Sequence, residues 1–334
     1  MNAKQRKQMR IIGIVLSVLL ALSMAACGGG SAAPVTQAQT TTAAPTTAAP
    51  TTAAPTTTQA PTTATTTTQA PTTAAPTTAA PTTAAPAGPK TQLTVFAAAS
   101  LTESMEEIAT LYAKVAPDVE IVYNFDSSGT LKTQIEEGAE CDLFISAGAK
   151  QVNELDISKD TETNPDQLDF VLQGTRVNLL ENQVVLVVPE TNPKGLSTFD
   201  DLAKILSDGE VLLAMGNSDV PVGQYTQRIL TFYSLNEEEL ANAGKISYGS
   251  NVKEVVTQVT EASVDAGVVY CTDAFSAGLE IMDSATAEMC GQVIYPAAVM
   301  KETKNADAAK AFLAYLADSE AMSAFEKVGF VAVK

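Results

Sequence analysis

The chain has 334 residues and a formal net charge of −18, and it contains no histidine and no tryptophan. Four of its 20 basic residues and none of its 38 acidic residues precede residue 90, so the rest carries a formal charge of −22. A surface this acidic argues against nucleic acid or an anionic lipid surface as a partner. The absence of histidine also excludes a nucleophile activated by histidine.

The chain begins with the three parts of an export signal. Basic residues at Lys4–Arg10 precede an apolar run at Ile11–Ala26, which is shorter than the ~20 residues of a membrane-spanning helix. We therefore interpret residues 1–26 as a signal peptide. Ser23–Cys27 reads Ser-Met-Ala-Ala-Cys and resembles a bacterial lipobox, which predicts lipidation of Cys27. Ordinary cleavage near Cys27, with release of a freely secreted protein, is the alternative.

A low-complexity segment follows at residues 27–89. It repeats Thr-Thr-Ala-Ala-Pro, as at Thr51–Pro55, and it has no charged or aromatic residue. Such a segment buries too little apolar surface to offset the entropy of ordering the chain. Closely spaced prolines favour extended conformations. The sequence predicts a disordered, semi-rigid stalk that carries the following domain away from a lipid-anchored N-terminus.

From Lys90 onward, short apolar runs alternate with segments of helical period, which is typical of an α/β fold with largely parallel sheets. Ser100 and Glu103 stand in capping-box relation at the start of the first predicted helix. The first series of predicted elements is strand 93–97, helix 101–115, strand 120–125, helix 130–137, strand 141–146 and a short helix after Gly148. The second series is strand 184–188, helix 198–207, strand 210–214, helix 225–234, strand 245–248, helix 252–261, strand 267–270, a short helix, strand 292–299 and helices 307–317 and 319–327.

We predict two α/β lobes, because about 245 residues is large for one core. The apolar strands 184–188 and 293–299 are expected to cross between the lobes, and two crossing strands form a natural hinge. Residues 90–180 and 297–334 would then form lobe one, and residues 181–296 would form lobe two. The terminal helices are expected to pack on lobe one.

Five predicted strand-to-helix turns are rich in hydroxyl and small residues and contain no Lys, Arg or His. Ligands of open α/β sheets bind beyond the carboxyl ends of strands, where helix N-termini offer free N–H groups to an anion. At any single turn a serine or threonine is more often only a helix cap, but five such turns facing one cleft indicate an anion site. The turns are Ala97–Thr102, Asp126–Thr130, Asp219–Gly223, Gly249–Val252 and Tyr270–Asp273.

Six segments carry a family resemblance, of which Val-Phe-Ala-Ala-Ala-Ser-Leu at Val95–Leu101 is the most specific. The other five are Phe125–Leu131, Cys141–Ala147, Val220–Tyr225, Gly267–Asp273 and Tyr295–Val299. Together they resemble the molybdate-binding proteins of bacterial ABC transporters, in the type II periplasmic binding protein superfamily. The resemblance extends over Leu93–Lys334. It implies a two-lobed, periplasmic-binding-protein-like fold for a solute-binding domain at 90–334.

The resemblance also implies that hydroxyls and backbone amides from both lobes hold an oxyanion. Two serine hydroxyls would come from lobe one, and two backbone N–H groups and a tyrosine hydroxyl from lobe two. The implied ligand-binding residues are Ser100, Ser128, Val222, Val252 and Tyr270. Gly129 departs from the family pattern, which has a hydroxyl residue there, and Val222 stands where alanine is common.

A site made only of uncharged donors suits an oxyanion that has no proton of its own at neutral pH, such as molybdate, tungstate or sulfate. The resemblance therefore predicts an extracytoplasmic, membrane-anchored bacterial lipoprotein that captures molybdate or tungstate for an ABC importer. Its expected partners are that oxyanion and the permease and ATPase subunits, and a monomer is expected. We expect no cofactor, no cation site and no catalysis, since the chain has no histidine and no Gly-x-Ser-x-Gly elbow surrounds Ser100.

Two other functions stay open at this level. The oxyanion could be sulfate, and the stalk would also suit a wall-associated adhesin. Cys141, Cys271 and Cys290 match no zinc pattern, and we interpret them as structural thiols.

Overall fold

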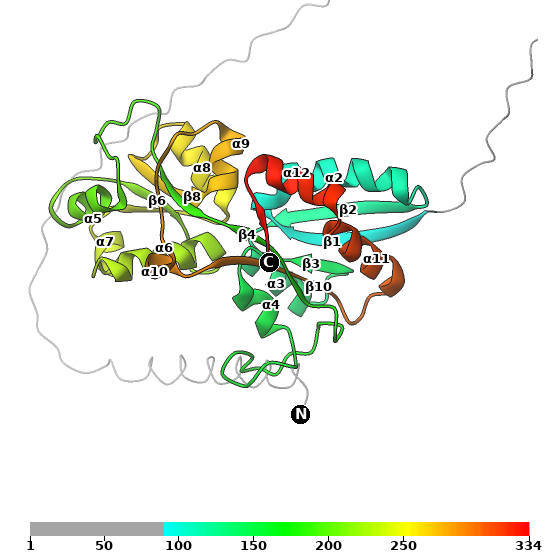
Figure 1. Cartoon of the computed structure of the whole chain (residues 1–334). Helices are drawn as coiled ribbons and strands as arrows, with labels where there is room; N and C mark the ends of the chain where they lie inside the picture. Colours follow the sequence, from blue (N-terminus) through cyan, green and yellow to red (C-terminus); the bar gives the residue numbers. More distant parts are fainter. Residues whose placement is uncertain (1–89, 334) are drawn as a thin grey trace, which may run out of the picture. The chain divides into compact units, whose positions relative to one another are not determined.

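The computed structural model describes residues 90–333. Its apolar strands form two separate sheets, and amphipathic helices pack against them (Figure 1). The predicted signal peptide, the stalk and Cys27 lie outside these residues. Each sheet is covered by helices, which makes two α/β lobes (Figure 1). Within residues 90–333 no helix is both long and apolar enough to span a membrane.

The sheet of lobe one has six strands in the order β11-β4-β10-β3-β1-β2. Strand β1 pairs in parallel with β2 and β3, whereas β10 is antiparallel to β3 and β4, and β11 is antiparallel to β4. The strands are β1 Thr91–Ala98, β2 Val119–Asp126, β3 Leu143–Ile145, β4 Val177–Asn182, β10 Val293–Val299 and β11 Val331–Ala332. The helices of this lobe are η1 Ala99–Leu101, α2 Thr102–Val115, α3 Ser128–Glu136, α4 Ala149–Glu154, α11 Ala306–Leu316 and α12 Ser319–Val328.

The sheet of lobe two has five strands in the order β7-β6-β8-β5-β9. Strand β6 is parallel to β7 and β8, and β5 is antiparallel to β8 and β9. The strands are β5 Val184–Val187, β6 Leu213–Gly216, β7 Ile246–Gly249, β8 Ala266–Tyr270 and β9 Ile281–Ser284. The helices are α5 Phe199–Asp208, α6 Pro221–Phe232, α7 Glu237–Asn242, α8 Val252–Thr260, α9 Cys271–Ala277 and α10 Ala287–Cys290. Both sheets are mixed, so the expectation of largely parallel sheets holds only for three strands in each.

Two segments cross between the sheets, but the first is not strand 184–188 by itself. Strand β5 lies wholly in lobe two, and the crossing is its junction with β4 at Gln183. Strand β10 makes the return and pairs antiparallel with β4, with Val293 opposite Asn182. The sheets therefore divide near 183 and 292 instead of at the expected 180 and 296. Strand β4 was not predicted because its Asn and Glu residues have low strand propensity, which pairing on both sides overrides.

The predicted capping box at the start of α2 is wrong. Ser100 lies inside the 3₁₀ turn η1, and Leu101 occupies the N-cap position of α2 without a side-chain cap. Real caps occur at α3, where the Ser127 hydroxyl accepts from Thr130 N, and at α8, which begins after Asn251. Ser100 is therefore free for a contact outside its own helix.

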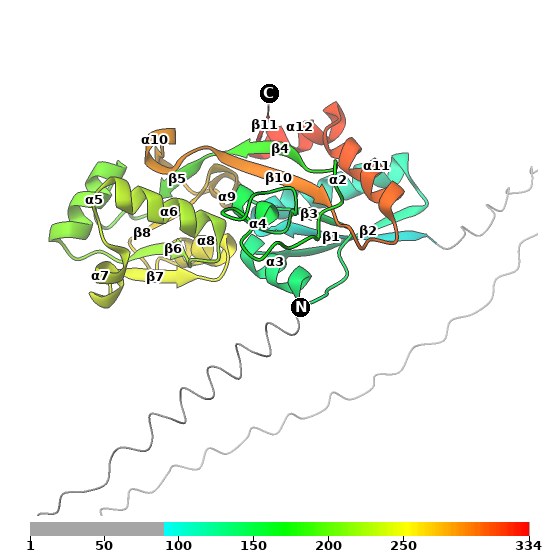
Figure 2. The same ribbon diagram turned by 90° about the horizontal axis from the view of Figure 1, so that it is seen from below.

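The terminal helices pack on lobe one, as predicted. Figure 2 shows α11 and α12 beside α2. The ring of Tyr112 in α2 lies 4.8 Å from that of Phe312 and 4.9 Å from that of Tyr315, both in α11. Aromatic pairs of this kind contribute about 0.5–1.5 kcal/mol beyond their buried area. Lobe one is thus completed by chain that has already passed through lobe two.

Candidate functional site

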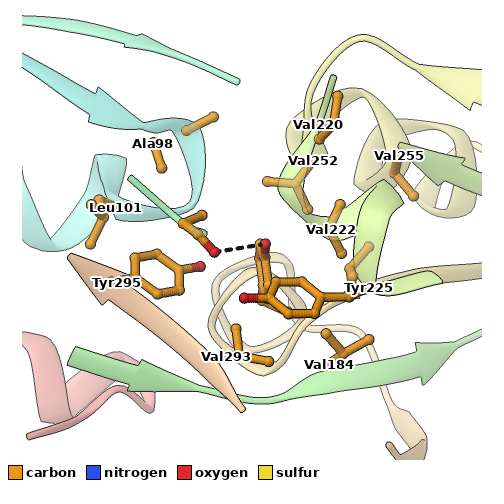
Figure 3. Close-up of a cluster of buried hydrophobic side chains, with 14 of the residues drawn as sticks. Ala98, Leu101, Val184, Val220, Val222, Tyr225, Val252, Val255, Val293 and Tyr295 are labelled. Carbon is orange, nitrogen blue, oxygen red and sulfur yellow. Dashed lines mark hydrogen bonds between the residues drawn. The ribbon is translucent and has the colours of Figure 1, made fainter. Parts of the chain in front are cut away.

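A small cavity lies where the two lobes face each other. Lobe one contributes the end of β1, η1, the start of α3 and Ala147; lobe two contributes the starts of α6 and α8 and the end of β8. Figure 3 shows Ala98 and Leu101 on one side and Val220, Val222 and Val252 on the other. The structure gathers all the predicted ligand-binding residues around this cavity: Ser100, Ser128, Val222, Val252 and Tyr270. Contact of these residues with a ligand stays a prediction.

Ser128 begins α3, directly after the capping residue Ser127. Its side chain is fully buried, and its Oγ accepts a hydrogen bond from the backbone N of Ala147 at 3.0 Å. Because the N–H of Ala147 occupies an acceptor position of the hydroxyl, the hydroxyl proton remains to be donated. Ser128 thus presents a donor where α3 meets the cavity.

Ser100 belongs to a buried polar chain that runs into the crossing between the lobes. Its Oγ lies 2.9 Å from the Oη of Tyr295 on β10. Tyr295 Oη in turn accepts from Asn182 Nδ2, at the end of β4, over 3.1 Å. Sequence reasoning missed both partners, since neither lies in a strand-to-helix turn and β4 itself was not predicted.

Backbone N–H groups of lobe two come from the first turns of two helices. Val222 follows Pro221 in α6, and Val252 is the first residue of α8. The first N–H groups of a helix have no partner within that helix, and the helix dipole adds partial positive charge. Helix α6 begins four residues before the predicted start at 225, because Pro221 suits a first helical position. The earlier start is what brings Val222 to the cavity.

Tyr270 ends β8 and is 1% exposed. Its Oη is 3.5 Å from the carbonyl oxygen of Ala147 in lobe one. Burial raises the pKa of Tyr270 well above its ordinary value of 10, so the phenol keeps its proton at neutral pH. The rings of Tyr225 and Tyr295 pack edge-on against the ring of Tyr270, with centroids 6.3 and 5.7 Å from its own. This packing holds a protonated donor in place.

Charge around the cavity does not favour an anion. Among the described residues that line it there is no Lys or Arg, and Asp126 is present. The Asp126 carboxylate accepts from the backbone N of Ser127 at 2.7 Å, which engages one of its oxygens. Affinity for an anion must therefore come from the hydroxyl and backbone donors.

The lobes also meet beside the cavity through backbone and small residues. A Cβ added at Gly129, in α3 of lobe one, would lie 2.1 Å from the carbonyl oxygen of Asp219 in lobe two. One added at Gly148 would lie 3.2 Å from the Cβ of Pro221. The departure of Gly129 from the family pattern thus coincides with a very close approach of the lobes. No local sequence signal reveals this, because the contact joins segments that are far apart in the chain.

Lys253 makes an ion-pair bridge between the lobes. Its Nζ lies 2.7 Å from Glu103 Oε1 in lobe one and 3.2 Å from Asp273 Oδ1 in lobe two. Asp273 is fully buried, and burial raises the pKa of its carboxyl to about 6 although Lys253 opposes the shift. The bridge lies next to Val252, so it couples the start of α8 to α2.

The chain has clear relatives among known proteins. Residues 93–331 match the family model described as "Bacterial extracellular solute-binding protein". A Bacillus subtilis protein named as a candidate ABC transporter substrate-binding lipoprotein is 38% identical over 249 residues, 73% of this chain and 87% of the relative. The molybdate-binding protein ModA of Haemophilus influenzae is 32% identical over 246 residues, 72% of this chain and 90% of the relative.

A solved structure is similar over the same part of the chain. It is the substrate-binding domain of a candidate molybdenum ABC transporter from Clostridium difficile, with a TM-score of 0.55 and 32% sequence identity. The match covers 73% of this chain and 100% of that domain.

Proposed function

The chain belongs to the bacterial extracellular solute-binding proteins, and on that premise we propose that it captures molybdate or tungstate outside the cell for an ABC importer. The observation that carries this proposal is a cavity between the lobes whose polar groups are mainly uncharged donors. Such a site matches an oxyanion without protons, because every oxygen of the ligand can only accept.

The donor set is sufficient for useful affinity. A hydrogen bond from an uncharged donor to a charged acceptor contributes roughly 1.5–3 kcal/mol. Five to eight such donors give roughly 8–24 kcal/mol in total, which can leave the ~8–12 kcal/mol of a micromolar to nanomolar ligand after the cost of association. Molybdate and tungstate both meet this requirement, and the relatives' names favour molybdate.

A role in an ABC importer implies partner subunits and a location at the membrane. Names of two relatives refer to ABC transporters, and one of these relatives is named a lipoprotein. We accordingly propose a permease and an ATPase as partners, lipidation at Cys27 and a monomeric solute-binding domain. Mass spectrometry of the membrane fraction tests the anchor: a diacylglyceryl group on an N-terminal Cys27 is expected, and an unmodified secreted chain would contradict it.

Isothermal titration of the folded domain with molybdate, tungstate and sulfate tests the ligand directly. We expect saturable heat with molybdate and tungstate at one site per chain, with sulfate displaced by either ion. Heat only with sulfate would reassign the ligand, and no heat with any of the three ions would contradict capture of an oxyanion.

Replacing Ser128 by alanine removes one donor from the cavity. We expect the affinity for molybdate to fall roughly ten- to a hundredfold, because one hydrogen bond to a charged acceptor is lost. Ser104→Ala is a matched control: Ser104 is also buried, but its hydroxyl donates to the Leu101 carbonyl at 3.0 Å, away from the cavity. Titration of both variants checks this, and equal affinity for the two would remove Ser128 from the site.

The rate of molybdate capture should rise when inert salt is added. The described domain is strongly acidic, and screening weakens its repulsion of a dianion beyond about 10 Å at 0.1 M salt. Stopped-flow tyrosine fluorescence suits the measurement, since the chain has no tryptophan. An association rate that falls with salt would show that a local positive field governs capture.

A further inference from the structure

We propose that Asn182 and Tyr295 are positioning residues that set the direction of the Ser100 hydroxyl, so that the site offers a donor and rejects oxyanions that keep a proton. This inference rests on the proposed oxyanion-binding function and identifies the residues that would make the site prefer an oxyanion without a proton. Both residues lie at the crossing between the lobes, Asn182 at the end of β4 and Tyr295 on the neighbouring strand β10.

The amide of Asn182 has one possible orientation. Its Oδ1 accepts from the backbone N of Gln183 at 2.8 Å and from the Cys271 thiol at 3.1 Å. A backbone N–H can only donate, so the oxygen must face Gln183. Burial raises the pKa of Cys271, which keeps this thiol protonated as a second donor. The Asn182 NH₂ group must therefore face Tyr295 and Thr272, at 3.1 and 3.0 Å.

This orientation decides the direction of the next bond. Tyr295 Oη accepts a hydrogen bond from Asn182, and burial raises the pKa of Tyr295 well above 10, so its own proton remains to be donated. We assign this proton to Ser100 Oγ, which lies 2.9 Å away. Once Ser100 accepts from Tyr295, its own proton is free for the cavity that it lines. The chain of donation runs from Asn182 through Tyr295 and Ser100 toward the ligand.

The hydrogen bonds from Asn182 to Ser100 lie where the polypeptide crosses between the lobes. Tyr295 is fully buried, Ser100 is 3% exposed and Thr272, on α9 of lobe two, is 1% exposed. Asn182 thus holds one residue from each lobe with the two hydrogens of a single NH₂ group. Buried polar networks of this kind are ordered because every unsatisfied member would cost free energy.

The direction of the Ser100 proton matters for ligand choice. Molybdate has only acceptor oxygens at neutral pH, so a donating Ser100 fits it. Inorganic phosphate keeps a proton between pH 6 and 8 and needs one acceptor in the site. Asp126 also lines the cavity, so the direction of the Ser100 proton is expected to set the ratio of the two affinities and not to exclude phosphate completely. If the Ser100 hydroxyl and the P–OH of phosphate both point their protons at each other, neither finds an acceptor. The unpaired polar groups cost binding free energy, and sites of this kind separate similar ligands by that cost.

Asn182→Asp tests the inference because it reverses the direction without changing the shape of the side chain. The ionised carboxylate of this variant only accepts, so Tyr295 donates back to it and Ser100 donates to Tyr295, leaving a lone pair toward the cavity. We expect molybdate affinity at pH 8 to fall about tenfold or more. The ratio of molybdate to phosphate affinity should fall by a similar factor.

Calorimetry on the full folded domain provides the controls. Wild type is titrated first. If wild type does not bind molybdate, the proposed function is contradicted, whatever the variants do. If wild type binds and Asn182→Asp keeps both the affinity and the ratio, the inference is overturned. Loss of molybdate binding without any change in the ratio would mean mere disruption, which also overturns it.

Two further variants keep the test decisive if Asn182→Asp does not fold. Tyr295→Phe keeps the ring packing but removes the group that orients Ser100, so we expect up to about a tenfold loss of molybdate affinity and a lower ratio of molybdate to phosphate affinity. Thr272→Val removes the other partner of Asn182 and should leave the ratio unchanged. Unaltered molybdate affinity in Tyr295→Phe would by itself contradict the proposal.

Discussion

Replacing Gly129 by alanine is expected to weaken molybdate binding on the order of a hundredfold, a large effect for a single methyl group. The added Cβ would lie 2.1 Å from the carbonyl oxygen of Asp219, a backbone atom that cannot rotate away. Overpacking of this kind costs about 1–3 kcal/mol. The lobes can avoid that cost only by separating, and separation withdraws the donors of lobe two from the ligand.

The ligand-free protein should not be weakened by the same change. Gly129 lies in α3, and alanine is favoured over glycine in a helix by about 1 kcal/mol. Thermal unfolding without ligand should therefore give a Tm equal to or above that of wild type, while calorimetry shows the loss of affinity. Thr133→Ala, on the exposed side of the same helix, is the matched control and should change neither quantity much. Wild-type affinity in Gly129→Ala would show that bound lobes are farther apart than they are here.

Replacing Lys253 by methionine is expected to lower the free energy of unfolding by about 3 kcal/mol at pH 8. Lys253 is the cation beside the buried Asp273 carboxylate, 3.2 Å from its Oδ1. Apart from Lys253, the carboxylate oxygens have no hydrogen-bond partner among the described residues. Without Lys253 the charge would be buried with no compensation. Chemical denaturation at fixed pH measures the loss.

The pH dependence of that loss has a definite sign. The pKa of Asp273 is raised from 3.8 to about 6, chiefly by burial, so folding favours its protonated form. The stability that this group contributes is fully present below pH 3.8 and is lost as the pH rises through about 6. In Lys253→Met the opposing cation is gone, the pKa rises further, and the loss extends to higher pH. The variant should thus differ least from wild type at pH 5 and most at pH 8.

Two variants separate the buried pair from the bridge between lobes. Lys253→Met combined with Asp273→Asn has no buried charge and should recover most of the lost stability and lose the pH dependence. Glu103→Gln breaks only the more exposed contact to Lys253, at 2.7 Å, and should cost less than about 1 kcal/mol. If the double variant is as unstable as Lys253→Met, the packing of the lysine stem and not the charge of Asp273 explains the effect.

Many elements could be predicted because their signals are local. The helix at Val252–Thr260 follows from valines at three- and four-residue steps, and the strand at Ala266–Tyr270 from a short apolar run. Strand β4 could not be predicted in this way, since its polar residues favour a loop and only pairing with β10 and β11 makes it a strand. The capping box at Ser100 failed for a related reason: the hydroxyl finds its partner on β10, 195 residues away.

The candidate site likewise has a part that local sequence patterns predict and a part that depends on contacts between remote segments. Strand-to-helix turns rich in hydroxyl and small residues can be recognised in the sequence, because the starts of helices always carry free N–H groups and follow the carboxyl ends of parallel strands. The turns therefore pointed to a donor site, and the family resemblance named Ser100, Ser128, Val222, Val252 and Tyr270. The groups that orient these donors or bring the lobes together lie elsewhere in the chain. Asn182, Tyr295 and Lys253 act through contacts between segments far apart in sequence.

The sequence by itself determined that this protein has an export signal pattern, an α/β domain and a set of uncharged donors at strand-to-helix turns. These features depend on composition and on residues within one or two turns of each other, which local propensity controls. Only the tertiary structure decided where the chain crosses between lobes, why residue 129 is glycine and which way the Ser100 hydroxyl points. Each of these depends on a distance between remote segments, and such distances are set by the packing of the two lobes and not by any local pattern.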